Sequence, residues 1–97
     1  MAFYPDELYR VLRERIDSGT PGDSYTKRLV TEGPPKMLRK LIEEAGEVAG
    51  ALVEGDDAHL VEEMADLWYH GLVILASRGI GPERVNDCLE ARHRRPR

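Results

Sequence analysis

Apolar residues recur every three or four positions along most of this chain, which is the spacing typical of amphipathic helices. Residues 5–18 form the first such segment, and Pro5 suits its first turn. Leu8, Leu12 and Ile16 share one face of that segment. The stretch that follows, SGTPGDS, consists of turn-forming residues, so we expect a linker there.

Two further helices are expected before the middle of the chain. A short helix over residues 25–32 has Ser24 as its N-cap and Gly33 at its end. Two prolines then suit the entry to a long helix that runs from residue 34 to about Glu54. Its apolar residues again follow the helical spacing.

The second half of the chain predicts another long helix and a final short one. Asp56 or Asp57 can cap the long helix, which is expected to end before Gly79. The last helix begins at Gly81–Pro82 and fades into the basic tail over residues 92–97. No segment has the alternation typical of a strand, so the fold class is all-α, with the two long helices paired as a central antiparallel hairpin.

Length adds an expectation about assembly. The chain has 97 residues, which predicts a single domain over residues 1–97. A chain of this size buries only about 60–65% of the surface of its unfolded form, so its own core is small. Association with another copy would therefore help to complete the helical bundle.

Composition excludes several classes of function. The net charge of −4 gives no electrostatic basis for binding nucleic acid. No apolar run approaches the roughly 20 residues that span a membrane, and the first residues lack the pattern of a signal peptide. The one cysteine, Cys88, rules out a disulfide framework within the chain, and burial on its helix face is the expectation for it. The simplest interpretation is a cytoplasmic protein.

One acidic phrase occurs twice, in the two long helices. LIEEAGEV covers residues 41–48 and LVEEMADL covers residues 60–67. At about 100° per residue, the three acids of each copy fall within an arc of about 100° that borders the apolar face. These acids are Glu43, Glu44 and Glu47 in the first copy and Glu62, Glu63 and Asp66 in the second. In an antiparallel hairpin the two acidic edges can face each other.

Facing carboxylates raise one another's pKa unless a cation neutralises them. An all-oxygen ligand set favours a hard divalent ion, Mg²⁺ with Mn²⁺ as the alternative. The candidate ligands are Glu44, Glu47, Glu63 and Asp66, while Glu43 and Glu62 lie further out. A single acidic pair is more often a solvated helix face, but two matched copies on neighbouring helices favour the metal site.

Three other residues share these faces. Lys36 and Lys40 precede Glu44 by two turns and one turn, where they can form ordinary salt bridges or bind phosphate beside the metal. His70 lies on the acidic face seven residues after Glu63, where it can contact substrate or pack between helices.

These residues also carry a resemblance to a known family. EEAGE followed by EEMAD resembles the acidic signature of the MazG-type all-α nucleoside triphosphate pyrophosphohydrolases. Within that superfamily the chain is similar to the phosphoribosyl-ATP pyrophosphohydrolases of histidine biosynthesis. The acidic signature specifies only the superfamily, whereas SYT before it and ADLWYH and RGI after it point to this family. The similar stretches cover nearly the whole chain.

The resemblance implies homo-oligomerisation, as an obligate dimer or a dimer of dimers of helices, with Mg²⁺ held by acids of the two central helices. It places metal ligands at Glu44, Glu47, Glu63 and Asp66 and gives Lys36 and Lys40 a role in binding substrate phosphate. His70 is a further candidate for substrate binding. The implied reaction is hydrolysis of phosphoribosyl-ATP to phosphoribosyl-AMP and pyrophosphate, with Glu43 or Glu47 as general base.

The same acids fit two alternatives. One is a house-cleaning pyrophosphohydrolase of the same superfamily that acts on dNTPs or damaged nucleotides. The other is a helical dimer without turnover that serves as an interaction or metal-binding module.

The chain also departs from the family at Gly46, where a better helix former is usual and glycine costs about 0.5–1 kcal/mol of helix stability.

Overall fold

The computed structural model describes residues 4–18 and 24–94, so residues 19–23 of the predicted linker over 18–24 lie outside the described part. Within those ranges all regular structure is α-helical, which confirms the all-α prediction. The helices are α1 (Tyr4–Asp17), α2 (Tyr25–Glu32), α3 (Pro34–Glu54), α4 (Asp57–Ser77) and α5 (Glu83–His93).

The predicted caps set the helix ends. The Ser24 hydroxyl accepts from the backbone N–H of Lys27 at 3.3 Å and so begins α2. The Asp56 carboxylate begins α4, because it accepts from the N–H of Ala58 at 3.0 Å and of His59 at 3.3 Å. Gly55 ends α3 in the left-handed region with φ of 82°, a conformation that glycine adopts without strain.

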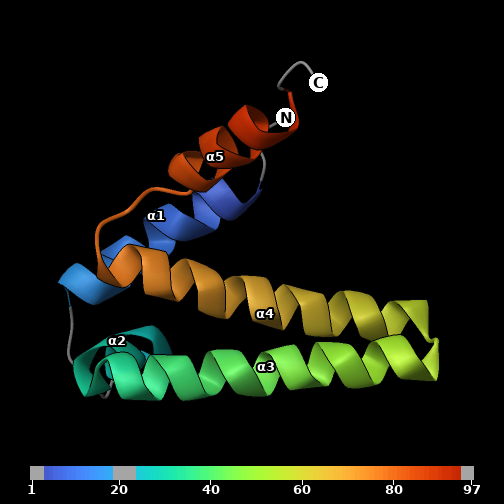
Figure 1. Cartoon of the computed structure of the whole chain (residues 1–97). Coiled ribbons are helices and arrows are strands. Elements are labelled where there is room, and N and C mark those ends of the chain that lie inside the picture. Colours follow the sequence, from blue (N-terminus) through green and yellow to red (C-terminus); the bar gives the residue numbers. More distant parts are fainter. Residues whose placement is uncertain (1–3, 19–23, 95–97) are drawn as a thin grey trace.

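The two long helices form the predicted antiparallel hairpin. Figure 1 shows α3 and α4 side by side along their whole length, joined by a tight turn at one end. At the other end α2 lies beside α3, and α1 packs on the opposite side of α4. The hairpin therefore brings the two acidic phrases onto neighbouring helices.

The core lies at the end of the hairpin that α1 and α2 cover. It joins residues from four helices, so no pair of helices could bury it alone. Its buried members are Leu12, Leu29, Met37, Leu72, Val73 and Ala76. Leu12 and Ala76 have no exposed surface, which fixes α1 against the C-terminal part of α4.

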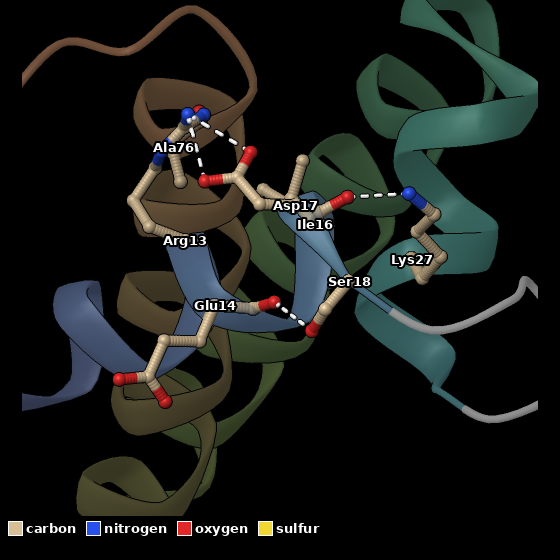
Figure 2. A network of polar contacts seen from close by, with 7 residues as sticks. All are labelled: Arg13, Glu14, Ile16, Asp17, Ser18, Lys27 and Ala76. Atoms are coloured by element: carbon tan, nitrogen blue, oxygen red, sulfur yellow. Dashed lines mark hydrogen bonds and ion pairs between the residues drawn. The ribbon is translucent and has the colours of Figure 1, made fainter.

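Two basic side chains bind helix C-termini in this region (Figure 2). Arg13 donates to the carbonyl of Ala76 at 2.6 Å and forms an ion pair with Asp17 at 3.1 Å. Lys27 donates to the carbonyl of Ile16 and so joins α2 to the end of α1. Carbonyls in the last turn of a helix lack partners within the regular part of that helix. Arg13 adds a second donor to the Ala76 carbonyl, which also accepts from the N–H of Gly79 at 3.1 Å, and Lys27 supplies a donor to the Ile16 carbonyl.

A second apolar face of α3 is exposed. At 100° per residue its members span about 100° and lie roughly a quarter turn from the face that packs on α4. We call this surface the α3 stripe: Leu38, Ile42, Ala45, Ala49, Leu52 and Val53. Val61, Ala65 and Trp68 of α4 are also exposed and share one side of that helix.

The last helix departs from one expectation. No described residue of α5 is buried, and Cys88 is exposed, so the prediction of a buried cysteine is wrong. The reason is that α5 extends away from the hairpin (Figure 1), and no other described helix packs along it. An apolar groove between α1, α4 and α5 is lined by Pro5, Trp68, Leu72, Val85 and Leu89.

Among the described helices, none is long and apolar enough to cross a membrane.

Candidate metal centre and active site

Three of the predicted ligands converge between the long helices. Glu44 of α3 and Glu63 and Asp66 of α4 each offer a carboxylate oxygen, and these oxygens all lie within 4.8 Å of one another. Glu44 and Glu63 are half-buried, whereas Asp66 is exposed at the edge. The hairpin thus brings Glu44 together with two acids that lie nineteen and twenty-two residues later in the sequence.

This group fits a hard divalent cation. An octahedral ion with bonds of 2.0–2.1 Å holds its ligand oxygens about 3–4 Å apart, so a small contraction of the group suffices. The ligand set contains oxygen only, which suits Mg²⁺ and Mn²⁺ better than softer metals. Three facing carboxylates would repel one another without a positive charge among them.

Glu47, the fourth predicted ligand, lies outside this group. It is exposed, because one turn beyond Glu44 the α3 surface has rotated by about 60° away from α4. Glu62 is also exposed and lies outside the group, in line with its expected place further out. Side-chain placement therefore separates the six acids of the two phrases into three that converge and three that do not.

Glu43 is paired with one of the predicted phosphate-binding lysines. The Lys40 ammonium lies 2.9 Å from a Glu43 carboxylate oxygen. This hydrogen bond is the main cause that raises the pKa of Lys40 and lowers the pKa of Glu43, and Lys36 adds to the lowering. Lys40 is accordingly held as a cation beside the acidic group, while Glu43 is weakened as a proton acceptor.

His70 is buried, with 8% of its surface exposed. Its Nδ1 lies 2.9 Å from the carbonyl oxygen of Asp66, and its Nε2 lies 3.0 Å from the hydroxyl of Tyr25. Both ring nitrogens therefore have partners within the protein. The predicted contact of His70 with substrate stays a prediction.

Tyr25 is tied to α4 by several aromatic contacts. Its ring stacks on Tyr69 with centroids 6.4 Å apart and meets the edge of His70 at 5.9 Å. The neighbouring Thr26 shares a hydrogen bond of 2.6 Å with the Tyr69 hydroxyl. Burial is the main cause that raises the pKa of Tyr25, and Lys40 opposes that rise. These contacts fix the start of α2 beside the acidic group.

His59 was not predicted from the sequence to lie at the site. Its Nδ1 lies 2.9 Å from Glu54, at the end of α3, and its Nε2 lies 3.4 Å from Glu63. The hydrogen bond to Glu54 is the main cause that raises the pKa of His59. Its spacing of four residues before Glu63 is a signal that could have revealed the second contact, because such residues are neighbours on a helix.

A comparison of the sequence with models of known families finds a match over the same part of the chain. The family model described as phosphoribosyl-ATP pyrophosphohydrolase matches residues 6–93. The chain belongs to this family. The match includes both acidic phrases, α2 and all of α5, so it covers the whole site and the helices that support it.

Several curated relatives agree with this assignment. A phosphoribosyl-ATP pyrophosphatase of Methylobacterium nodulans is 48% identical over 86 residues, which cover 89% of this chain and 79% of that protein. One of Pyrobaculum arsenaticum is 44% identical over 89 residues, covering 92% and 94%. A third, of Trichlorobacter lovleyi, is 46% identical over 87 residues, covering 90% and 80%. The resemblance inferred from the acidic phrases is thereby confirmed.

Proposed function

We propose that this member of the phosphoribosyl-ATP pyrophosphohydrolase family hydrolyses phosphoribosyl-ATP to phosphoribosyl-AMP and pyrophosphate. The observation that carries the proposal is the convergence of Glu44, Glu63 and Asp66 within 4.8 Å on the helices that the family match spans. The relatives with which this chain aligns over most of their length are named phosphoribosyl-ATP pyrophosphatase. In a biosynthetic setting this reaction belongs to the histidine pathway.

Mg²⁺ is the proposed cofactor, with Mn²⁺ as a substitute. Glu44, Glu63 and Asp66 would hold the ion, and the ion would supply charge neutralisation at the phosphate oxygens and polarisation of the bond that breaks. Lys40, held by Glu43 at 2.9 Å, would bind a phosphate oxygen from the α3 side. Lys36 is half-buried one turn earlier on α3 and would extend this positive edge.

The reaction needs a proton acceptor for the attacking water. As water adds to phosphorus, the α–β phosphoanhydride P–O bond breaks, pyrophosphate leaves and a proton of the water passes to a carboxylate. Glu43 suits this role poorly because Lys40 lowers its pKa. Glu47 is exposed beside the acidic group and is the better candidate for the base, unless it joins the metal as a fourth ligand.

The proposed oligomer is a dimer or a dimer of dimers. The α3 stripe exposes large aliphatic side chains such as Ile42, which is 62% exposed, and Leu52, which is 65% exposed. Burying this area on a second copy would be favourable by about 25 cal/mol per Å² of apolar surface. A second hairpin could cover the α3 stripe, as in a four-helix bundle.

The first experiment measures pyrophosphate release with Mg²⁺ from phosphoribosyl-ATP, ATP and the four dNTPs. We expect a strong preference for phosphoribosyl-ATP. A preference for a dNTP would instead indicate a house-cleaning pyrophosphohydrolase that uses the same acids. Absence of turnover on every nucleotide, together with stable self-association, would favour the non-catalytic helical module.

Matched variants test the metal site in the same assay. Glu63→Gln is expected to lower kcat/KM at least about 100-fold, because it removes a charged ligand. Glu62→Gln makes the same change one residue earlier, outside the group, and is expected to stay within about twofold. Glu47→Gln separates its two roles: an increased Mg²⁺ requirement marks a ligand, whereas a lower kcat at an unchanged Mg²⁺ requirement marks the base. Equal activity of Glu63→Gln and wild type would rule out the site.

A further inference from the structure

A groove between α1 and α4 adjoins the acidic group. Its volume is about 410 Å³, which is within the range of small-molecule binding sites. Asp66 lines this groove and also offers an oxygen to the group of Glu44 and Glu63, so the groove and the candidate metal centre share a residue. We call it the aromatic groove, and its lining includes Tyr4, Pro5 and Leu8 of α1 and Asp66, Trp68 and Tyr69 of α4.

The aromatic groove and the acidic group suit different parts of a ligand. Asp66 is the only charged residue among the described residues that line the groove, and the others are apolar or aromatic. The groove therefore offers no cation to a phosphate, whereas an uncharged ring would bury apolar surface there. A ligand that fills both places has an anionic part that binds metal and a flat, uncharged part beside it. A nucleotide has this composition.

Aromatic side chains of both helices can contact such a ring. Tyr4 of α1 is 66% exposed and Trp68 of α4 is 53% exposed, so each has surface available to a ligand. A nucleotide base presents a flat π face that stacks on aromatic side chains of this kind. The groove thus combines an apolar hollow with the side chains that bases prefer.

Tyr69 gives the groove a rigid wall. Its hydroxyl shares a hydrogen bond of 2.6 Å with Thr26, and its ring stacks on Tyr25 with centroids 6.4 Å apart. The same ring meets His70 edge to face at a centroid distance of 5.2 Å. A side chain that is already held in place loses little freedom when a ligand binds, which favours affinity.

We propose that the aromatic groove binds the base of the nucleotide, with Trp68 as its stacking residue. One ribose separates the base of a nucleotide from its α-phosphate, so a base in a groove that includes Asp66 leaves the phosphates beside the acidic group. Trp68 contacts the base through its ring, and Tyr4 bounds the groove from α1. This inference rests on the proposed function, because the phosphates bind at the acidic group.

Two ligands test the groove and the acidic group separately. α,β-Methylene-ATP carries a base and resists hydrolysis between its α and β phosphorus atoms, whereas inorganic tripolyphosphate has no base. Trp68 is the only tryptophan of the chain, so the tryptophan emission reports on this groove alone. With Mg²⁺ and saturating ligand, we expect α,β-methylene-ATP to quench the emission and tripolyphosphate to leave it nearly unchanged.

Equal quenching by the two ligands, or none by either, would overturn the inference. Emission that ignores both ligands but shifts when the protein is diluted would show instead that a second copy covers the groove.

Matched variants measure the contribution of the ring by calorimetry. Trp68→Leu keeps an apolar side chain but removes the π face, and it is expected to raise the Kd of α,β-methylene-ATP about tenfold. The Kd of tripolyphosphate is expected to stay within about twofold, because the acidic group is unchanged. Trp68→Phe retains an aromatic face and is expected to weaken α,β-methylene-ATP by less than about threefold.

Val61→Ala is the control for Trp68→Leu. Val61 is an exposed apolar residue on the same side of α4 and lies outside the aromatic groove. The variant is expected to keep both Kd values within about twofold. Equal losses of affinity for the two ligands in Trp68→Leu would show a merely structural role for Trp68, and unchanged affinity for α,β-methylene-ATP would exclude stacking; either result would overturn the inference.

These measurements also distinguish this inference from the proposed function. A protein whose Trp68 emission responds to α,β-methylene-ATP but which does not cleave phosphoribosyl-ATP would defeat the proposed reaction and support the groove as a base-binding site. Cleavage of phosphoribosyl-ATP by a protein whose emission does not respond would support the reaction and overturn the role of the groove.

Discussion

At the scale of single residues, neighbours in space give different roles to acids that look alike in sequence. Glu44 and Glu47 belong to the same acidic phrase, yet Glu44 lies half-buried with the acids of α4 and Glu47 is exposed. Glu43 forms an ion pair with Lys40 of the same helix, and this contact lowers the pKa of Glu43. The environment of each carboxylate, rather than its place in the phrase, sets its chemistry.

His59 gives a prediction about pH at this scale. Its pKa in the folded protein is raised, chiefly by the hydrogen bond to Glu54. The stabilisation that it contributes is complete below its unfolded pKa of about 6.5 and is lost as the pH rises through the raised folded value. His59→Gln is therefore expected to destabilise the protein at pH values near 6 and to have progressively less effect toward pH 9.

The measurement is denaturant unfolding of wild type and variant across this pH range, with a chelator present so that no divalent cation binds. Glu54→Gln removes the main cause of the raised pKa of His59. This variant is therefore also expected to be less stable than the wild type near pH 6 and to approach its stability toward pH 9. Two stability curves that stay parallel across the whole range would contradict the prediction.

At the scale of elements, two glycines near the hairpin turn affect stability in opposite directions. Gly46 lies within α3, and a Cβ added there would meet no atom within 4 Å. Gly55 ends α3 with φ of 82°, where a side chain is strained regardless of space. The first glycine weakens a helix that alanine would favour, and the second permits a turn that alanine would resist.

Gly46→Ala is expected to raise the free energy of unfolding by about 0.5–1 kcal/mol, because alanine is the better helix former. Gly55→Ala is expected to lower it by about 1–2 kcal/mol, because the left-handed conformation is costly for a residue with a Cβ. Both values come from denaturant unfolding at a fixed protein concentration. Changes of the same sign in the two variants would refute this account of the hairpin. A loss of association in Gly46→Ala would place residue 46 in a subunit contact.

At the scale of the whole molecule, the exposed apolar surface is large for a small chain. The chain has 97 residues, and its buried core draws on only a few side chains from four helices. The α3 stripe is exposed and extends from Leu38 to Val53, which is most of the length of α3. A stable protein of this size gains from burying such a stripe against a second copy.

We expect sedimentation to give a mass of two or four times the 11.0 kDa of one chain. Ile42→Lys places a charge in the α3 stripe and is expected to shift the protein toward the monomer, because an ammonium is costly to bury. Glu14→Lys introduces the same residue on an exposed position of α1 and serves as the control. A monomeric wild type, or equal association in both variants, would contradict the proposed assembly.

The sequence by itself determined the helices and the acids that matter. Ser24, Gly33 and Gly55 were predicted as helix ends and lie there, because capping depends on residues within about four positions along the chain. The all-α fold and the antiparallel hairpin followed from periodicity and from the short connection at Gly55. The family followed from the two acidic phrases and the motifs beside them.

Only the tertiary structure decided which side chains meet. Tyr25 and His70 are 45 residues apart, and no spacing in the sequence indicates that the hydroxyl reaches the ring. Glu44 joins Glu63 and Asp66 while Glu47 does not, because the packing of α3 on α4 sets which side of each helix faces its neighbour. Cys88 is exposed since α5 leaves the hairpin. Local hydrogen bonds fix where a helix begins and ends, but the angle and rotation at which helices pack depend on the whole set of side chains between them.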